Sequence, residues 1–577
     1  MKEDIYEPLS RYRDEFREKF SRLAAEKFEA MTSASRVDTA ANKILAGNIR
    51  KLEAERSRVE GYRTLWQILN FFLILLGIGG VVTVIFALMT EDPRWLACRP
   101  QLLGGGITAA AAGFWLFFQW SLPACRNVEK KIAQLTEKID AKIREAWEQM
   151  APLNALFDWS ITAELIEKTV PRLQFDPFFT EARLRDLQTS YGWDESFMQD
   201  KSVIHVHSGV INDNPFALVE MRRQEWGTKT YTGYLEISWT EQVRDSEGKT
   251  RTVRRYQTLT AHVEKPIPVY MNDKVLIYGS EAAPELDFSR KPSDLSGEKG
   301  GLWNTIKRSH RLSKLKKQAR NLDDDSDFTM MSNEEFELLF HANDRSDEIA
   351  FRLLFTPLAQ QQMVALLNDR DIGFGDDFHF IKEDKINMIF AQHLYDVSFS
   401  HDPEQFKGYD FESVKAYFLR YNNAFFKAAY FAFAPLLVIP LYQQTRTRQA
   451  IYGEKEQQIS SGWEHEALAN YYGDGVFEHP SCVTQNILKT RCLNRHGNRA
   501  EIEVTASGFR GDDRLEFVSV YGGDGRWHSV PVEWVEYLPV EKTSRFEITD
   551  LPEETQIDPL REQALLRRSI YSHLGLS

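Results

Sequence analysis

The sequence has little cysteine. Four of its 577 residues are cysteines, Cys98, Cys125, Cys482 and Cys492. They are too few and too widely spaced for a disulfide framework or for the closely spaced pairs of a common zinc site. The sequence therefore predicts that the bulk of the protein lies in a reducing compartment.

The sequence also lacks an excess of basic residues and the motifs of common enzyme classes. Its 71 Lys and Arg residues stand against 84 Asp and Glu residues, giving a formal net charge of -13. Nucleic-acid binding requires a basic surface that neutralises phosphates, so we expect no nucleic-acid partner. The chain has no Walker loop, no G-x-S-x-G turn and no dinucleotide fingerprint. No catalytic residue and no cofactor are predicted.

Two groups of potential metal ligands carry a weak signal. His205 and His207 lie on one face of a predicted strand, where a surface or half-buried pair is the favoured interpretation. A second group follows the spacing H-x2-C-x9-C-x3-H, which is irregular for a zinc finger: His479, Cys482, Cys492 and His496. A structural zinc there stays open as the less favoured alternative, and no metal is predicted.

Two long uncharged runs predict a transmembrane hairpin within residues 65–125, with spans at about 65–89 and 101–123. Each run exceeds the roughly 20 apolar residues that cross a hydrocarbon core. Gly105, Ala109 and Gly113 share one face of the second run, and Gly77 and Gly80 lie in the first. These small residues either let the two helices pack closely or are glycines that lipid tolerates. The N-terminal segment lacks the apolar core of a cleavable signal peptide, so we expect insertion through the internal runs.

Basic residues predict the orientation of this hairpin. Between the two runs, the segment TEDPRWLACRP (90–100) has two arginines, which Glu91 and Asp92 offset. The outer flanks are richer in basic residues: Arg50, Lys51, Arg56, Arg58 and Arg63 on one side, and Arg126, Lys130 and Lys131 on the other. The positive-inside rule then places both flanks and the N-terminus in the cytoplasm. The expected location is a bacterial inner membrane, with the short connection outside.

Apolar periodicity continues on both sides of the hairpin. Residues 1–64 are amphipathic, and in residues 126–150 apolar side chains recur every three or four positions, from Val128 to Met150. An antiparallel helical stalk that buries both stripes is expected, about 37 Å long at 1.5 Å per residue. A free face that awaits a partner helix is the alternative.

Past residue 151 the sequence predicts an α+β domain over residues 151–420 and a small β-rich region over residues 446–577. Strand-like runs occupy residues 228–243 and 250–264 around the turn RDSEGK, and further strands are expected at 201–211, 215–221, 274–279, 378–391 and 500–508. Helices are predicted at 161–170, 333–340 and 357–368. The mixture is typical of an α+β fold.

Two stretches of this region carry a family resemblance. Residues 166–221 read as a helix, an extended link and a strand pair, and residues 331–390 contain Glu335, Phe336 and Phe340, followed by Thr356 and Pro357. Together they resemble the bacterial membrane protein family catalogued as domain of unknown function 3137, over roughly residues 1–420. The family's Phe-Gly element after the first hairpin is missing here. The resemblance implies a membrane-associated assembly, often neighbouring LemA-type proteins, and no catalytic residue.

The most distinctive local feature is a basic stretch followed by an acidic one, in a loop predicted near residues 289–328. Asp323, Asp324, Asp325 and Asp327 form the acidic part. The basic part is a candidate contact for anionic lipid: Lys307, Arg308, Arg311, Lys314, Lys316, Lys317 and Arg320. The favoured alternative is a solvated loop whose basic half pairs with its acidic half, and a nucleic acid or other partner is the least favoured one.

A third apolar run over residues 424–442, within the segment 421–445, contains Lys427, Pro435 and Pro440. Its continuous apolar part is short for a membrane span, and prolines break helix interiors. A buried or interfacial segment is therefore favoured over a third span.

The functional hypothesis is a membrane-anchored scaffold or regulatory interaction protein. Its expected partners are the lipid bilayer, anionic lipid head groups, and a membrane protein or a second copy of the chain. A membrane-bound enzyme with a ligand site in the α+β domain is the alternative. A channel is disfavoured because neither predicted span carries an ionisable residue.

Overall fold

The computed structural model describes residues 4–90, 95, 98–244, 250–293, 295–296, 302–318, 329–342, 344–444, 459–550, 564–567 and 570–573. The fold is α+β, with 50% helix and 30% strand. The chain forms two compact units. We call residues 25–157 and 403–420 the helical unit, and residues 1–24, 158–402 and 421–577 the β unit. The predicted domains 151–420 and 446–577 thus contribute mainly to one unit.

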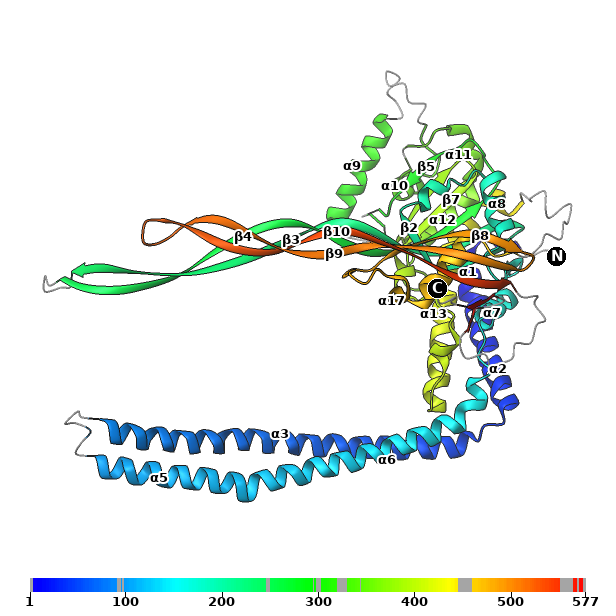
Figure 1. Ribbon diagram of the computed structural model, residues 1–577. Coiled ribbons are helices and arrows are strands. Elements are labelled where there is room, and N and C mark those ends of the chain that lie inside the picture. Colours follow the sequence, from blue (N-terminus) through cyan, green and yellow to red (C-terminus); the bar gives the residue numbers. More distant parts are fainter. Residues whose placement is uncertain are drawn as a thin grey trace. The chain divides into compact units, whose positions relative to one another are not determined.

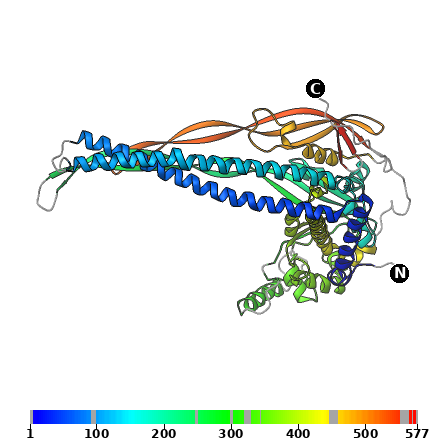
Figure 2. The same ribbon diagram turned by 90° about the horizontal axis from the view of Figure 1, so that it is seen from below.

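The helical unit contains two long antiparallel helices (Figures 1 and 2). The first is α3 (Thr39–Met89), which Asp38 caps by accepting from two backbone amides. The second runs through α5 (Arg99–Leu116), the π-helical turn η2 (Phe117–Ser121) and α6 (Leu122–Asn154). Both are long and apolar enough to cross a membrane, and only 22% and 11% of their most apolar stretches are buried. Most of the predicted outer connection, 91–94 and 96–97, lies outside the described residues.

Small residues bring the two apolar helices together, but not all of those expected. A Cβ added to Gly113 would lie 2.7 Å from the backbone N of Gly77, and one on Gly80 would lie 2.5 Å from the backbone N of Ala110. Gly105 has nothing within 4 Å. Gly113 of the predicted face therefore makes a close contact and Gly105 does not, and Gly106 and Ala110 also take part in the contact.

The apolar stripes next to the candidate spans pack against each other as the stalk prediction required. Leu45 and Ile49 of α3 meet Ile139 and Ala146 of α6 in one cluster. The segment after η5 (Pro403–Phe406) is fixed to this pair by hydrogen bonds. The buried Asn42 side chain donates to Tyr409 O (2.9 Å) and accepts from Phe411 N (2.9 Å). These bonds satisfy backbone groups of the linking segment before α13 (Phe411–Leu437).

The β unit has two fully antiparallel sheets. The first has the order β1-β2-β3-β4-β7-β6-β5 and the second β11-β12-β10-β9-β8. The strands of the first sheet are β1 (Leu173–Phe175), β2 (Lys201–Ile211), β3 (Asn214–Arg244), β4 (Thr250–Gly279), β5 (Phe288–Arg290), β6 (Phe378–Glu383) and β7 (Ile386–Ala391). Those of the second are β8 (Ile487–His496), β9 (Arg499–Tyr521), β10 (Trp527–Asp550), β11 (Ala564–Arg567) and β12 (Ile570–His573).

Helix α16 (Gly462–Tyr472) connects the cores of the two sheets. Its Trp463 and Ala467 pack in the core of the first sheet, and its Leu468 and Ala469 pack in that of the second. Because one helix supplies apolar side chains to both cores, the C-terminal strands belong to the same compact unit as the first sheet.

Shorter helices cover the rest of the β unit. Several begin with side-chain caps: Asn333 caps α10, and Thr356 caps α12 directly before Pro357. The third apolar run lies in α13 and α14, and residues 425–439 are buried except Lys427. Helix α2 (Arg17–Ser35) passes from the β unit into the helical unit. The bounds of the others are α1 (Pro8–Arg11), η1 (Tyr12–Phe16), α7 (Ile161–Thr169), α8 (Glu181–Thr189), η3 (Glu195–Met198), α9 (Leu302–Gln318), α10 (Glu334–Phe340), α11 (Glu348–Leu354), α12 (Pro357–Asn368), η4 (Gln392–Asp396), α14 (Pro440–Gln444) and α17 (Asp474–Phe477).

Two long hairpins, β3–β4 and β9–β10, run side by side and form an arm (Figure 1). The predicted strands at 215–221 and 228–243 are one continuous strand, β3, whose 31 residues span about 100 Å at 3.3 Å per residue. Residues 274–279 are likewise the end of β4. Of the predicted turn RDSEGK (244–249), residues 245–249 lie outside the described residues. Pro266 and Pro268 lie in a part of β4 that, among the described residues, pairs with β3 alone, so the second edge of β4 needs no amide donor there.

Candidate functional site

Helix α9 carries the predicted basic patch and is held against α10. Leu315 is buried. Arg308 pairs with Glu335 at 3.1 Å, and Lys316 pairs with Glu334 at 2.7 Å. Two of the seven predicted lipid-contact residues therefore pair with carboxylates of the neighbouring helix.

The other members of the patch have different surroundings. Lys307, Lys314 and Lys317 are exposed and recur at a spacing that puts them on one side of α9. Arg311 is half-buried and lines a pocket. Arg320 and the four aspartates of the acidic stretch lie outside the described residues, so the predicted pairing of the basic half with the acidic half stays a prediction.

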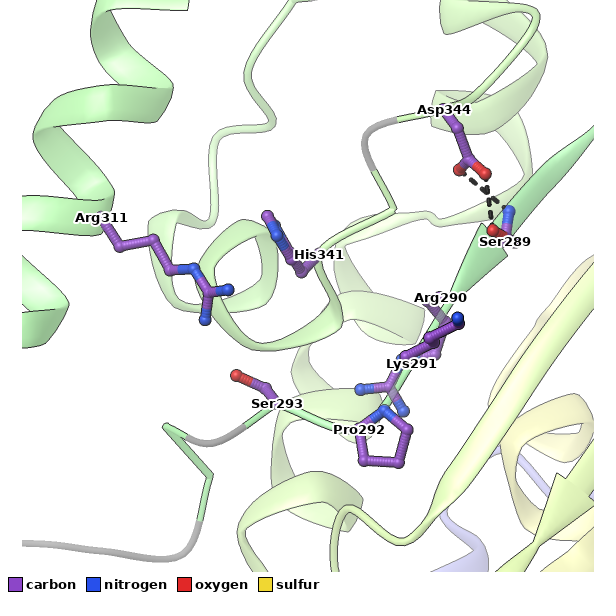
Figure 3. A pocket seen from close by; sticks show the side chains of 8 residues that line it. All are labelled: Ser289, Arg290, Lys291, Pro292, Ser293, Arg311, His341 and Asp344. Carbon is purple, nitrogen blue, oxygen red and sulfur yellow. Dashed lines mark hydrogen bonds between the residues drawn. The ribbon is translucent and has the colours of Figure 1, made fainter. Parts of the chain in front are cut away.

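A pocket of about 570 Å³ lies between α9 and the segments that follow β5 and α10; we call it the α9 pocket. Figure 3 shows the side chains of Arg311, His341 and Ser293 around one part of it, with Asp344 on the side away from Arg311. Its lining residues are Ser289, Arg290, Lys291, Pro292, Ser293, Arg311, His341 and Asp344. The lining is thus rich in cations and hydroxyls.

Arg290 fixes the floor of this pocket from inside. Its guanidinium is fully buried, pairs with Asp376 at 2.6 Å, and donates to the carbonyls of Leu339 and Phe340 at the end of α10. Helix C-termini leave such carbonyls without helical donors. Asp376 also accepts from Ser293 N at 2.8 Å. One buried ion pair therefore positions three segments around the pocket.

The electrostatic environment of the pocket wall is positive. Burial lowers the pKa of His379 on β6, and the charges of Lys291 and Arg290 lower that pKa further, against a smaller opposite effect of Asp344. Asp344 itself accepts from Ser289 N at 3.0 Å and from Ser289 Oγ at 2.6 Å. Both oxygens of Asp344 are therefore already engaged with Ser289, the first residue of the pocket-lining segment 289–293.

The residues weighed as metal ligands occupy separate places. His207 Nε2 lies 2.7 Å from Phe399 O, and the His207 ring stacks on His401. His479 contacts Ser481, and Cys482 contacts Thr484, each within two positions along the chain. Within the described part of the chain, no group of three or more His, Cys, Asp or Glu side chains is arranged to hold a metal ion.

A buried Ser–His contact before α16 has no accessible nucleophile. Ser460 Oγ lies 3.0 Å from His465 Nε2, and both residues are at most 3% exposed. Asp550 binds Arg495 at 2.6 Å and accepts from Ser460 N. Burial lowers the pKa of His465 to about 3, so the ring is neutral near pH 7. These groups hold the start of α16 against β10.

The two hairpins of the arm are packed through their facing sides. Leu259 and Ala261 of β4 are buried against Val530 and Val532 of β10. At Gly233 an added Cβ would lie 2.0 Å from the backbone O of Pro531, so the two backbones approach too closely for a side chain there. The arm is therefore a two-layered structure with one internal apolar layer.

The outward side of the β9–β10 hairpin is also apolar; we call it the arm face. Val518, Val530 and Val532 point into the internal apolar layer. Because successive side chains of a strand point to opposite sides, the odd-numbered residues of this part of the hairpin point outward. Four outward side chains are largely exposed: Leu515 (53%), Phe517 (64%), Tyr521 (58%) and Trp527 (70%).

Sequence reasoning identified part of α9 but missed the pocket and the arm face. The signal for the second hairpin was present: Val518 and Val520 precede the turn Gly522–Gly525, and Val530 and Val532 follow it at the same alternation. No comparable signal in the sequence connects Lys291, Arg311 and His341, which come from three separate segments.

Comparison with models of protein families, with curated proteins and with solved structures finds no match to this chain. The function must therefore be argued from the arm face, the α9 pocket and the two apolar helices.

Proposed function

We propose that this protein is a membrane-anchored scaffold of the bacterial inner membrane, whose arm face binds a protein partner. The observation that carries the proposal is the arm face itself. Large exposed apolar patches on soluble surfaces mark interaction sites, and aromatic side chains are enriched in the cores of interfaces. Phe517, Tyr521 and Trp527 meet this description.

Charge favours a protein over a lipid surface as the occupant of the arm face. Asp513 and Glu533 are exposed beside Leu515 on the same outward side. An anionic leaflet repels carboxylates, whereas an apolar protein surface with a basic rim complements them. The proposed partner is therefore a protein with that surface. If the partner were a second copy of this chain, the test would detect this chain alone.

We also propose that the segments flanking the two apolar helices lie in the cytoplasm. The basic residues outside the two apolar helices support a cytoplasmic location of both flanks by the positive-inside rule. The exposed lysines Lys314 and Lys317 on α9 would then contact anionic head groups, each contributing about 1 kcal/mol near the surface.

Membership in the family of domain of unknown function 3137 also stays a proposal. Its motif residues have structural surroundings in this chain: Phe336 and Phe340 stack on each other and contact Phe355. Thr356 and Pro357 begin α12. These roles support a structural core rather than a catalytic site in that block.

A membrane-bound enzyme with its ligand site in the β unit is the second candidate, and the α9 pocket is the observation that favours it. The two candidates differ in what they need from the arm face. An enzyme acting on a small ligand in the α9 pocket does not need Phe517 or Trp527 for turnover.

The scaffold proposal is tested by isolating the tagged full-length protein in mild detergent and identifying proteins bound at stoichiometric level. The test variant replaces Phe517 and Trp527 by Ser. The matched control replaces Tyr234 and Tyr256 by Ser, since both are at least 64% exposed on the other hairpin. We expect a partner with the wild type and the control and its loss with the test variant. Absence of any partner, or its retention by the test variant, would contradict the proposal.

A further inference from the structure

We propose that the α9 pocket binds a phosphate group carried by a small polar molecule or by a lipid head group. This inference does not depend on the arm face. It deepens the membrane proposal only if the phosphate belongs to a lipid, because that case alone requires α9 to meet the cytoplasmic leaflet.

Three potential cations reach the pocket from different parts of the chain. Lys291 follows β5, Arg311 lies in α9, and His341 ends α10 in a left-handed backbone conformation with φ of 53°. Figure 3 shows Arg311 and His341 on adjacent sides of the same space. Donors that approach from several directions suit a tetrahedral phosphate better than a planar carboxylate, and charge-assisted bonds to phosphate are strong.

The hydroxyl of Ser293 adds a donor at a fixed position. Ser293 N donates to Asp376, and Ser293 Oγ accepts from Leu295 N at 3.2 Å. The hydroxyl proton can then point to a bound oxygen. Because Asp376 is itself held by the buried Arg290, the donor is preorganised before any ligand binds.

The size and the rest of the lining restrict the ligand further. A volume of about 570 Å³ exceeds what a phosphate ion fills and lies in the range of small-molecule sites. Among the described residues, Pro292 is the one apolar side chain in the lining, and no Phe, Tyr or Trp of this described set is placed to stack on a base. Asp344, whose two oxygens already accept from Ser289, repels a second anionic group. The chemistry is therefore that of a phosphorylated polyol, free or as a head group.

The contacts of α9 allow the role of Arg311 to be tested separately from the docking of the helix. The ion pairs Arg308–Glu335 and Lys316–Glu334 hold the helix on either side of Arg311 along the sequence. Replacement of Arg311 therefore leaves both of these ion pairs in place. Lys314, one turn further along, is exposed and is absent from the lining.

The test measures hydrogen–deuterium exchange of residues 302–318 in the full-length protein held in nanodiscs. One arm adds glycerol 3-phosphate to discs of phosphatidylcholine. The other arm uses discs of phosphatidylcholine and phosphatidic acid without a soluble ligand. Protection in the first arm identifies a soluble phosphorylated ligand, and protection in the second arm alone identifies a lipid head group.

Arg311→Gln is expected to abolish the protection or to raise the half-saturating glycerol 3-phosphate concentration at least about tenfold, the effect of losing one charged contact. Lys314→Gln removes the same charge from the same helix and should leave the protection unchanged. Lack of protection in both arms, or an equal effect of the two substitutions, would overturn the proposal.

Discussion

The carboxylate of Asp376 lies 2.6 Å from the guanidinium of Arg290, and neither side chain has any exposed area. The pair lies between the end of α10 and the start of β6, and Arg290 binds carbonyls of both. The pair thus connects the end of α10, the start of β6 and the segment after β5. The ion pair therefore determines the geometry of the α9 pocket.

Asp376→Asn is expected to lower the free energy of unfolding by about 3–5 kcal/mol, because it leaves the Arg290 charge buried without a counter-charge. Chemical denaturation of the detergent-solubilised protein measures this. Glu241→Gln is the control, since Glu241 pairs with Arg255 at the surface and such pairs contribute about 0–1 kcal/mol. Equal losses of unfolding free energy in the two variants would show that Asp376 is not needed to neutralise the buried charge of Arg290.

Gly113→Ala is expected to destabilise the packing of the two apolar helices by about 1–3 kcal/mol, because its Cβ would lie 2.7 Å from the backbone N of Gly77. Gly105→Ala has open space around it and should be neutral. The melting temperature of each variant in detergent checks the difference. A loss that is as large for Gly105→Ala would contradict the contact between Gly113 and α3.

Acid should destabilise the protein partly through His465. Burial lowers its folded pKa to about 3 from 6.5, so the unfolded chain binds the extra proton between these values. The stabilisation is complete above about pH 6.5 and is lost as the pH falls toward 3, by up to about 1.4 kcal/mol per pH unit. His465→Gln should have a shallower pH dependence of the unfolding free energy over this window. Parallel curves would mean that the ring is not held neutral.

Cysteine labelling tests the orientation of the helical unit. Cys98 and Cys492 are exposed, whereas Cys125 is buried and Cys482 is half-buried. In intact spheroplasts a membrane-impermeant maleimide is expected to label Cys98 and to reach Cys492 only after permeabilisation. Cys98→Ser and Cys492→Ser identify each signal. Labelling of Cys492 in intact spheroplasts would place the β unit outside.

Elements with strong local signals could be predicted from the sequence. Residues 201–211 contain five Val and Ile residues and coincide with β2. The Thr356–Pro357 start of α12 has a cap and a proline in the first helical turn. The prolines in the third apolar run argued against a membrane span, and that run is buried in the β unit. In each case the deciding residues are neighbours along the chain.

The arm could be predicted only in part. Residues 222–229 pair with 265–272 although Arg222, Arg223 and two prolines interrupt any apolar alternation. Their strand conformation depends on the partner strand, which a window of sequence does not contain. The packing of β9–β10 on β3–β4 depends on contacts such as Lys265 with Glu516, about 250 positions apart along the chain.

The candidate site was predictable as a charge cluster and not as a pocket. The seven basic residues of the predicted patch are visible in the sequence, and six of them lie in α9. Which of the six pair with carboxylates and which line the pocket depends on where other segments lie. Glu334 and Glu335 engage Lys316 and Arg308, while Lys291 joins Arg311 at the pocket. Spacing within α9 holds no information on those partners.

The most direct test of the scaffold account is site-specific photo-crosslinking from the arm face in living cells. A photoreactive amino acid at position 517 should give a discrete adduct with a protein partner, and one at position 236, on the outward side of the other hairpin, should not. The account predicts an adduct from the photoreactive residue at position 517 that is lost when Trp527→Ser is introduced into the same chain. No protein adduct from position 517, or equal adducts from both positions, would contradict it.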